Sequence, residues 1–278
     1  MSDVWRTAGR PNVMLAHTRP LACRVEALQD ATAEVRIVRL AIVGGGAFRF
    51  APGQYARVAF GDQAPRPFSM ASRPDEEHLE FHVRHASNGG ASAYAARQLR
   101  RGDGVWVEGP YGDAWLRPDH RGPIVAIAGG TGLAPMKSIV GAALAARRRA
   151  EVHLYFGARD EGGIYLEDYF RQLESAHRSF RYVPALSHPG AASGRHVPAG
   201  GESRRRSGLV TDAVAADFAS LAGAKAYLAG PPAMVEAAVR LLLTRGMARC
   251  DIHGDAYSVE AARPAPLDAA LGCGTGQR

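Results

Sequence analysis

The most restrictive feature of this sequence is an apolar run followed at once by a glycine-rich turn and a helical segment. Residues 123–128 read PIVAIA, which is typical of a strand buried on both faces. The turn GGTGLAP occupies 129–135, and a helical pattern continues from Pro135 to Arg148. This order indicates dinucleotide binding in a parallel α/β sheet, although Pro135 replaces the third glycine of the standard fingerprint.

The second half of the chain continues to alternate strands and helices. Apolar runs predict strands at 152–157, 181–186 and 226–229, and helical patterns cover 165–175, 212–221 and 233–245. Such alternation implies a parallel sheet covered by helices. We therefore expect an α/β nucleotide-binding domain over residues 118–260, with a surface insertion rich in glycine, serine, proline and arginine at 187–207.

The first half has a different pattern. Short β-rich runs at 25–28, 35–42, 55–60, 79–83 and 105–107 are separated by glycine and proline turns, and one helix is expected at 92–100. Strands of this length and spacing predict an antiparallel barrel or sandwich. We place this domain at residues 21–117, with a flexible leader at 1–20 and a flexible tail at 261–278.

Charge and cysteine content limit the classes of function. The chain has 34 basic and 27 acidic residues, a net charge of +7, which suits phosphate-bearing cofactors, acidic proteins or nucleic acid. No nucleic-acid recognition motif or basic–aromatic interleaving accompanies this charge, so nucleic acid is not expected as a partner. The three cysteines, Cys23, Cys250 and Cys273, are too few and too widely spaced for an iron–sulfur cluster or an all-cysteine zinc site.

The sequence contains no apolar run of membrane-spanning length and no secretory signal at its first residues. We therefore expect a cytoplasmic protein that does not insert into a membrane. Free thiols are the expected state of the cysteines in that compartment.

Arg66-Pro67-Phe68-Ser69 offers a cation, a ring and a hydroxyl along a short extended segment. A flavin needs these groups: a cation for its pyrophosphate, an apolar surface for its ring and a hydrogen-bonding group near N5. Taken alone, the pattern of this segment favours an ordinary strand with one exposed arginine over a flavin site.

Three further turns carry ligand-binding patterns. Residues 87–92, SNGGAS, open a helix and suit a phosphate, or form a plain loop with Ser92 as the N-cap. Residues 229–234, AGPPAM, follow a strand, where α/β sheets bind ligands. At the end of another strand, Asp160 and Glu161 favour the ribose 2′-hydroxyl of NADH, whereas Arg159 favours the 2′-phosphate of NADPH.

The order of these motifs closely resembles the ferredoxin–NADP reductase superfamily, and most of all the reductase components of bacterial oxygenases. The motifs are PGQY, RPFS, GGAS, GPYG, GGTGLAP, FGAR and AGPPAM, and the resemblance extends from Cys23 to Tyr257. It implies an FAD-binding antiparallel β-barrel followed by a parallel-sheet α/β domain that binds NAD(P)H.

The resemblance also implies roles for individual residues. Hydride from the nicotinamide would reach flavin N5 beside Ser69, and Tyr257 would place an aromatic ring near the flavin; these two residues are the catalytic candidates. The residues implied for FAD are Arg66, Pro67, Phe68, Ser69, His82, Val83, Arg84, Gly90, Ala91 and Ser92. Those implied for the pyridine nucleotide are Gly130, Thr131, Gly132, Pro135, Arg159, Asp160, Gly230, Pro231, Pro232 and Met234. No metal ligand is implied.

Two positions depart from the family pattern. Phe68 stands where a tyrosine is usual, and Ala229 stands where many members have a cysteine before the GPP turn. If that cysteine assists hydride transfer, the step would be slower or differently tuned in this chain.

The predicted function is an FAD-dependent oxidoreductase that takes hydride from NAD(P)H, with NADH favoured. Electrons would pass to a separate acceptor such as an acidic iron–sulfur protein, because the chain lacks cysteines for a cluster of its own. The alternative is an NAD(P)H reductase of free flavin or small acceptors. Two arginine runs, 147–149 and 204–206, are either docking charges for the acceptor or a solvated face.

Overall fold

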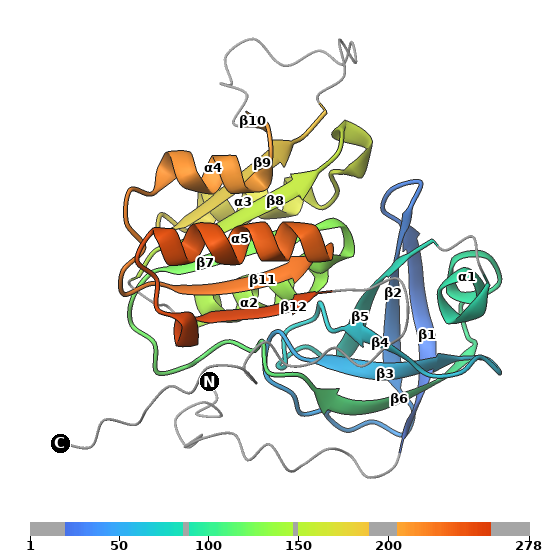
Figure 1. Cartoon of the computed structure of the whole chain (residues 1–278). Helices are drawn as coiled ribbons and strands as arrows, with labels where there is room; N and C mark the ends of the chain where they lie inside the picture. Colours follow the sequence, from blue (N-terminus) through green and yellow to red (C-terminus); the bar gives the residue numbers. More distant parts are fainter. Residues whose placement is uncertain (1–19, 86–88, 147–149, 189–204, 257–278) are drawn as a thin grey trace.

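The computed structural model describes residues 20–85, 89–146, 150–188 and 205–256. These residues form two six-stranded sheets, one in each half of the chain, placed side by side (Figure 1). The first sheet is antiparallel throughout and the second is parallel throughout. The predicted fold class, an antiparallel barrel followed by a parallel α/β unit, is confirmed.

The first sheet has the strand order β4-β3-β6-β1-β2-β5. Its strands are β1 (Leu21–Asp30), β2 (Val35–Ile42), β3 (Tyr55–Phe60), β4 (Arg66–Ser69), β5 (His78–Arg84) and β6 (Gly104–Tyr111). A bridge between Met70 and Phe81 joins the two edge strands and so brings the sheet round into a barrel. The barrel interior is apolar, and helix α1 (Gly90–Arg97) packs on it with Ala91 and Ala95 buried.

The second sheet has the strand order β10-β9-β8-β7-β11-β12. Its strands are β7 (Ile124–Gly129), β8 (Val152–Ala158), β9 (Phe180–Leu186), β10 (Arg206–Ser207), β11 (Lys225–Gly230) and β12 (Ile252–Ala256). Its helices are α2 (Leu133–Ala145), α3 (Glu167–Ala176), α4 (Val210–Asp217) and α5 (Pro232–Thr244), with single turns η1 (Gly130–Gly132), η2 (Glu161–Gly163) and η3 (Arg249–Asp251). Helices α2 and α3 cover one face and α4 and α5 the other, so every residue of β7 is buried.

Several predicted boundaries were wrong. The helix expected at 212–221 is α4, which spans 210–217. It begins earlier because the Asp212 side chain accepts a hydrogen bond from the Leu209 amide. It ends earlier, and the Leu221 amide donates to the Arg245 carbonyl instead of continuing the helix. Helix α1 lies at 90–97 rather than 92–100. Strand β1 is longer than expected, and β12 was not predicted.

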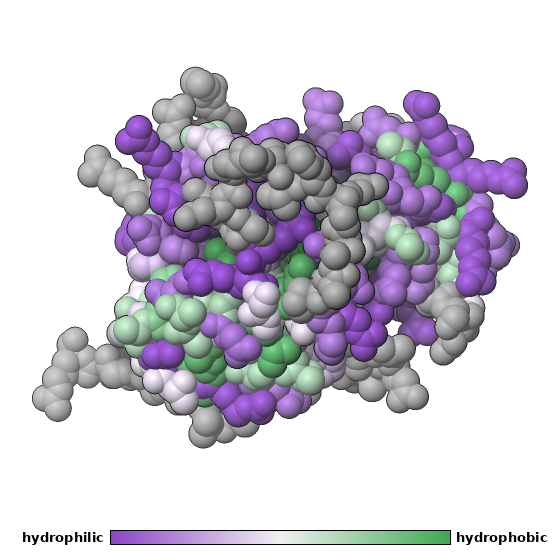
Figure 2. All heavy atoms as spheres, turned by 90° about the horizontal axis from the view of Figure 1, so that it is seen from above, coloured by the Kyte–Doolittle hydropathy of each residue, from purple (hydrophilic) through white to green (hydrophobic). Residues whose placement is uncertain are grey.

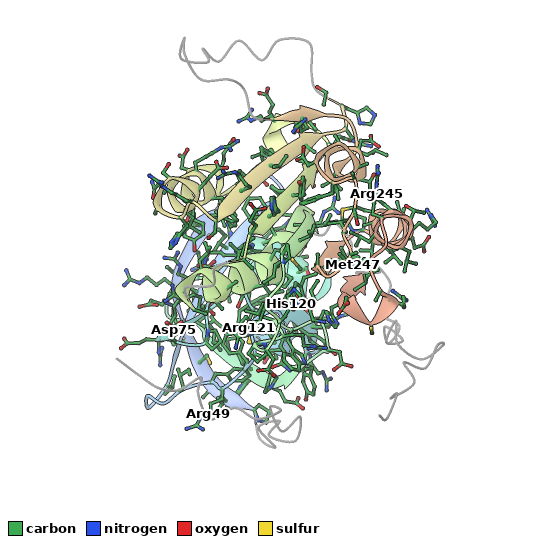
Figure 3. The ribbon with its side chains drawn as sticks, turned by 90° about the vertical axis from the view of Figure 1, so that its left-hand side faces the viewer. Arg49, Asp75, His120, Arg121, Arg245 and Met247 are labelled. Atoms are coloured by element: carbon green, nitrogen blue, oxygen red, sulfur yellow. The ribbon has the colours of Figure 1, made fainter. Side chains whose placement is uncertain are left out.

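The connection between β6 and β7 fastens the two units together. The Arg117 amide donates to the Tyr227 hydroxyl at 2.9 Å, and the guanidinium of Arg117 lies 3.7 Å from the centre of the Trp115 ring. Figure 3 labels His120 and Arg121 on the same connection. The His253 ring stacks on Tyr227 at 5.4 Å, and burial, followed by the charge of Arg117, lowers the pKa of His253 to about 4.

We expect the protein to lose stability on acidification partly through His253. Its pKa is 6.5 when unperturbed and about 4 in the folded chain, so below pH 6.5 the unfolded chain binds a proton that the folded chain does not. This group should therefore remove about 1–2 kcal/mol of unfolding free energy between pH 6.5 and 4, after allowance for its partial exposure. Urea unfolding at several pH values should show a shallower decline for His253→Phe; an unchanged decline would contradict the assignment.

Candidate functional site

The glycine turn after β7 lies against the turn that joins β11 to α5. A Cβ atom on Gly132 would lie 2.0 Å from the Ala229 carbonyl oxygen, and one on Gly129 would lie 2.7 Å from the Met234 sulfur. Neither position can hold a larger residue without movement. The structure therefore brings together the two turns, GGTGLAP and AGPPAM, that the sequence identified separately.

Gly130 differs from the glycines on either side of it. Its φ of 56° lies in the left-handed region, and no heavy atom lies within 4 Å of the position its Cβ would occupy. The turn thus presents an open stretch of backbone at the carboxyl end of a central strand. Both the location and the backbone exposure fit a dinucleotide.

A second open glycine segment lies on the barrel. Gly89 and Gly90 both have positive φ, at 79° and 74°, with open space at each Cβ position. Gly89, rather than Ser92, is the N-cap of α1, no side chain caps this end, and the first turn has no acidic residue. Its amides and helix dipole are suited to a phosphate group, so these residues fit the pyrophosphate of FAD.

Residues 66–69 form strand β4, which pairs with β3. Arg66 and Pro67 are exposed, Phe68 lies 5.5 Å from Phe60 between ring centres, and Ser69 is buried. Arg66 pairs with Val58 on β3, and Gly61 near the end of that strand touches Tyr94 of α1. Arg66 on β4 and helix α1 thus both lie beside β3, and a cation and helix amides are groups that can bind a pyrophosphate.

Strand β5 carries three of the predicted FAD residues, and its side chains have different surroundings. Arg84 is exposed and paired with Glu34, Val83 belongs to the barrel core, and His82 is buried. His82 takes part in a network that the sequence analysis missed, with Glu80 at its centre.

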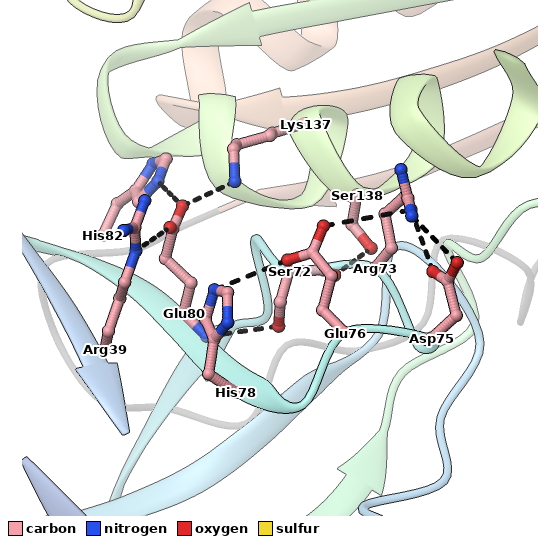
Figure 4. A network of polar contacts seen from close by, with 10 residues as sticks. All are labelled: Arg39, Ser72, Arg73, Asp75, Glu76, His78, Glu80, His82, Lys137 and Ser138. Carbon is pink, nitrogen blue, oxygen red and sulfur yellow. Dashed lines mark hydrogen bonds and ion pairs between the residues drawn. The ribbon is translucent and has the colours of Figure 1, made fainter. Parts of the chain in front are cut away.

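Glu80 is a fully buried carboxylate held by three partners (Figure 4). Lys137 Nζ donates to Oε1 at 2.8 Å, Arg39 Nε donates to Oε2 at 2.8 Å, and His82 Nε2 lies 3.1 Å from Oε1. Glu80 belongs to the barrel, whereas Lys137 is on α2 of the nucleotide unit. This buried ion pair therefore joins the two units.

The same interface has a second polar contact. Ser138 Oγ, one residue after Lys137, donates to the Ser72 carbonyl at 2.7 Å. Arg73 lies along α2, where a Cβ on Gly141 would be 3.0 Å from its Cδ atom. One sequence signal could have drawn attention to α2: Lys137 is one of only two lysines in an arginine-rich chain.

The ionisation of the network follows from its charges. Burial by itself would raise the pKa of Glu80, but the hydrogen bond with His82 and the charge of Lys137 hold this pKa well below its usual range. Burial lowers the pKa of His82; Glu80 opposes this, and the positive charges of Lys137 and Arg39 add to it. At neutral pH we therefore treat Glu80 as ionised and His82 as neutral.

His82 also connects the barrel to the glycine turn. Its Nδ1 lies 3.0 Å from the hydroxyl of Tyr165, and this hydroxyl lies 3.3 Å from the Gly130 carbonyl oxygen. The predicted FAD strand and the predicted nucleotide turn are therefore linked through one buried tyrosine, a residue given no role in the sequence analysis.

The segment that follows β8 carries exposed charges of both signs. Arg159, Asp160 and Glu161 are exposed there. Arg205 is engaged with acidic partners, at 2.5 Å from Glu167 and 3.7 Å from Glu161. Arg206 is paired with Asp217 at 2.7 Å. Two arginines of the 204–206 run thus neutralise acidic side chains of this chain.

Some predicted residues cannot be placed. Tyr257, Arg147, Arg148, Arg149 and Arg204 lie outside the described residues. Within the described ranges, no cluster of three or more His, Cys, Asp or Glu side chains could hold a metal ion. None of the helices that the structure describes is long and apolar enough to cross a membrane.

Comparison with known proteins assigns both units. Residues 22–115 match the family model described as an oxidoreductase FAD-binding domain, and residues 126–240 match the oxidoreductase NAD-binding domain. The reductase component of the naphthalene 1,2-dioxygenase/salicylate 5-hydroxylase systems of a Ralstonia species is 39% identical over 233 residues, covering 84% of this chain and 67% of that protein. The reductase subunit of an Amycolatopsis aromatic O-demethylase is 37% identical over 247 residues, covering 86% and 70%.

Solved structures agree with this assignment. An Amycolatopsis cytochrome P450 reductase superposes with a TM-score of 0.76 at 35% identity, covering 86% of this chain and 69% of that one. The ferredoxin reductase in carbazole 1,9a-dioxygenase gives a TM-score of 0.72 at 26% identity, covering 85% and 69%. Both superpositions include the barrel and the α/β unit, since each covers most of this chain.

Proposed function

Because this chain belongs to the ferredoxin–NADP reductase superfamily, as do the reductase components of oxygenase systems, we propose that it oxidises NADH and reduces a separate iron–sulfur protein. The chain is an NAD(P)H-dependent FAD oxidoreductase that supplies electrons to an oxygenase or ferredoxin partner. The choice of NADH and the iron–sulfur nature of the acceptor are the proposed parts.

One observation carries the proposal: two open glycine segments, one for each cofactor, are connected through β5. Gly89 and Gly90 begin α1 on the barrel, and Gly130 begins η1 on the α/β unit. His82 of β5 reaches the Gly130 carbonyl through Tyr165. Strand β5 contacts both α1 and η1, which supports one nucleotide site on each unit.

FAD, when bound, supplies redox chemistry that side chains lack, since it accepts a hydride and can release electrons singly. We propose that Arg66 and the α1 amides hold its pyrophosphate, and that Phe68 and Ser69 lie along its flavin end. Gly130, Thr131 and the turn at 230–234 would receive the nicotinamide nucleotide. The contribution of these residues is mainly positioning, because a fixed geometry removes the entropic cost of bringing two reactants together.

The NADH preference is supported by the charges after β8. A 2′-phosphate there would meet the exposed carboxylate of Asp160, and the nearby cation Arg205 is already engaged with Glu161 and Glu167. A ribose 2′-hydroxyl could donate to Asp160 instead. Arg159 is the exposed cation that would favour NADPH.

We expect Asp160→Asn to reduce the preference for NADH over NADPH by roughly tenfold, because it removes one charge that repels a 2′-phosphate. The measurement is kcat/KM for each nucleotide with a small artificial acceptor. Asp168→Asn, on the surface of α3, serves as a charge-matched control and should leave the ratio unchanged. An Asp160→Asn ratio equal to that of the parent protein would contradict the placement of the ribose.

The acceptor proposal is supported by the relatives and by charge. The Ralstonia relative serves dioxygenase and hydroxylase systems, and the net charge of +7 favours an acidic partner. Hydrophilic side chains cover much of the surface seen in Figure 2. Contacts that a partner makes with charged side chains on this surface should weaken with salt.

The deciding experiment is anaerobic stopped-flow absorbance of the FAD-loaded protein in two stages. The first stage mixes it with NADH or NADPH, and rapid bleaching by NADH is the expected result. The second stage mixes the reduced protein with an acidic [2Fe–2S] ferredoxin at rising ionic strength, and the rate should fall. Fast transfer to free flavin alone, with no transfer to the ferredoxin, would instead support a reductase of free flavins.

A further inference from the structure

We propose that Tyr165 is a positioning residue for the pyridine-nucleotide turn, and that its one hydroxyl proton is shared between His82 on the barrel and the Gly130 carbonyl. The hydroxyl then links η1 to β5, the strand that carries three of the predicted FAD residues. This inference rests on the proposed placement of the nucleotide at η1.

The position of the Tyr165 ring is fixed by its neighbours. The residue is 4% exposed, and its ring meets the His82 ring edge-on at 5.3 Å and the Phe156 ring edge-on at 5.6 Å. Its hydroxyl therefore has little freedom to move away from the two groups beside it. One of these is His82 Nδ1 at 3.0 Å and the other is the Gly130 oxygen at 3.3 Å.

Counting protons shows that these contacts are mutually exclusive when His82 is neutral. A phenol has one proton to donate, and a neutral imidazole has one N–H. Glu80 is a charged acceptor at Nε2, so the imidazole proton belongs on Nε2. Nδ1 is then an acceptor, and it competes with the Gly130 carbonyl for the Tyr165 proton.

A protonated His82 would change this arrangement. Both ring nitrogens would donate, Tyr165 O would accept from Nδ1, and the phenol proton would be directed to the Gly130 carbonyl. The ionisable groups facing His82 come from three elements: Glu80 on its own strand, Arg39 on β2 and Lys137 on α2; Tyr165 completes its surroundings. The two cations oppose protonation and so favour the neutral ring at neutral pH.

With a neutral His82 the hydroxyl proton alternates between the nitrogen at 3.0 Å and the Gly130 oxygen at 3.3 Å, so Tyr165 donates to η1 for part of the time. The hydroxyl still occupies the space beside that carbonyl and limits how η1 can move. A tyrosine that only packed in the core would need neither of these polar contacts. Removing the hydroxyl alone therefore tests whether the contacts matter.

The chain supplies a matched control in Tyr182. This tyrosine is buried in the same unit, on β9, and its hydroxyl makes no hydrogen bond within the described residues. Tyr165→Phe and Tyr182→Phe each remove one buried hydroxyl from the nucleotide unit. Only the first should affect the glycine turn.

The experiment compares hydrogen–deuterium exchange of peptides covering residues 126–134, and NAD⁺ binding by calorimetry, in the FAD-loaded parent and both variants. Tyr165→Phe should exchange faster at the turn and bind NAD⁺ roughly two- to tenfold more weakly, the range for one lost hydrogen bond. Tyr182→Phe should match the parent in both measurements. Equal behaviour of the two variants would overturn the proposal.

Nitrogen-15 NMR of the histidine side chains gives an independent readout. The expected spectrum of the parent has His82 protonated on Nε2 and unprotonated on Nδ1, and the opposite tautomer would refute the proton assignment. If the parent protein binds neither NAD⁺ nor NADH, the proposed function fails. In that case the exchange comparison still decides whether Tyr165 fixes the turn.

Discussion

Replacing Glu80 by glutamine is expected to lower the free energy of unfolding by about 3–5 kcal/mol. The carboxylate is fully buried, and its charge compensates Lys137, whose side chain is only 9% exposed. Glutamine retains the size of the side chain but leaves a buried ammonium group without an opposite charge at 2.8 Å. Because Lys137 and Glu80 come from different units, the loss should also loosen the interface between them.

Urea unfolding followed by circular dichroism measures this effect, with Glu34→Gln as the matched control. Glu34 forms an exposed ion pair with Arg84, at 3.1 Å, and such pairs contribute less than about 1 kcal/mol. The double variant Glu80→Gln/Lys137→Met should be more stable than Glu80→Gln alone, since it removes the uncompensated charge. A double variant no more stable than the single one would show that the ion pair is not the source of the loss.

Gly132→Ala is expected to destabilise the protein by about 3 kcal/mol or more and to abolish measurable nucleotide binding. The added methyl group would lie 2.0 Å from the Ala229 carbonyl oxygen and 2.4 Å from its carbon. These are backbone atoms of a central strand, so they cannot rotate away as a side chain would. Relief requires η1 and the β11–α5 turn to separate.

Thermal unfolding and NAD⁺ titration check this prediction. Gly104→Ala is the control, because no atom lies within 4 Å of the added methyl group on β6. Its stability should stay within about 0.5 kcal/mol of the parent, as for other surface substitutions. Equal stability of Gly132→Ala and Gly104→Ala would mean that the two turns do not pack as closely as described.

Much of the fold could be predicted because its signals are local. A fully buried strand in a parallel sheet must be apolar at every position, and residues 124–128 are. Glycine-rich turns between a strand and a helix can likewise be recognised in the sequence, and both GGTGLAP and AGPPAM lie at strand ends. The helix, strand and turn preferences that predict these elements depend only on residues close together in the chain, so they can be read from the sequence.

The partners of charged and polar groups could not be predicted in this way. Glu80 and Lys137 are 57 residues apart in the chain, and His82 and Tyr165 are 83 apart. The sequence placed Glu80 and His82 in a strand but could not show what faces them across the interface. The sequence offered a docking charge or a solvated face for Arg205, and it could not show that this residue pairs with Glu167.

The sequence by itself therefore determined the two sheets, their order and the turns that suit cofactors. Only the tertiary structure decided that GGTGLAP packs on AGPPAM, and that Glu80, His82 and Tyr165 connect the barrel to Gly130. The physical reason is the sequence distance over which each interaction acts. Backbone propensities and hydrophobic periodicity act over a few residues, whereas the energy of a buried charge depends on groups that the fold brings beside it.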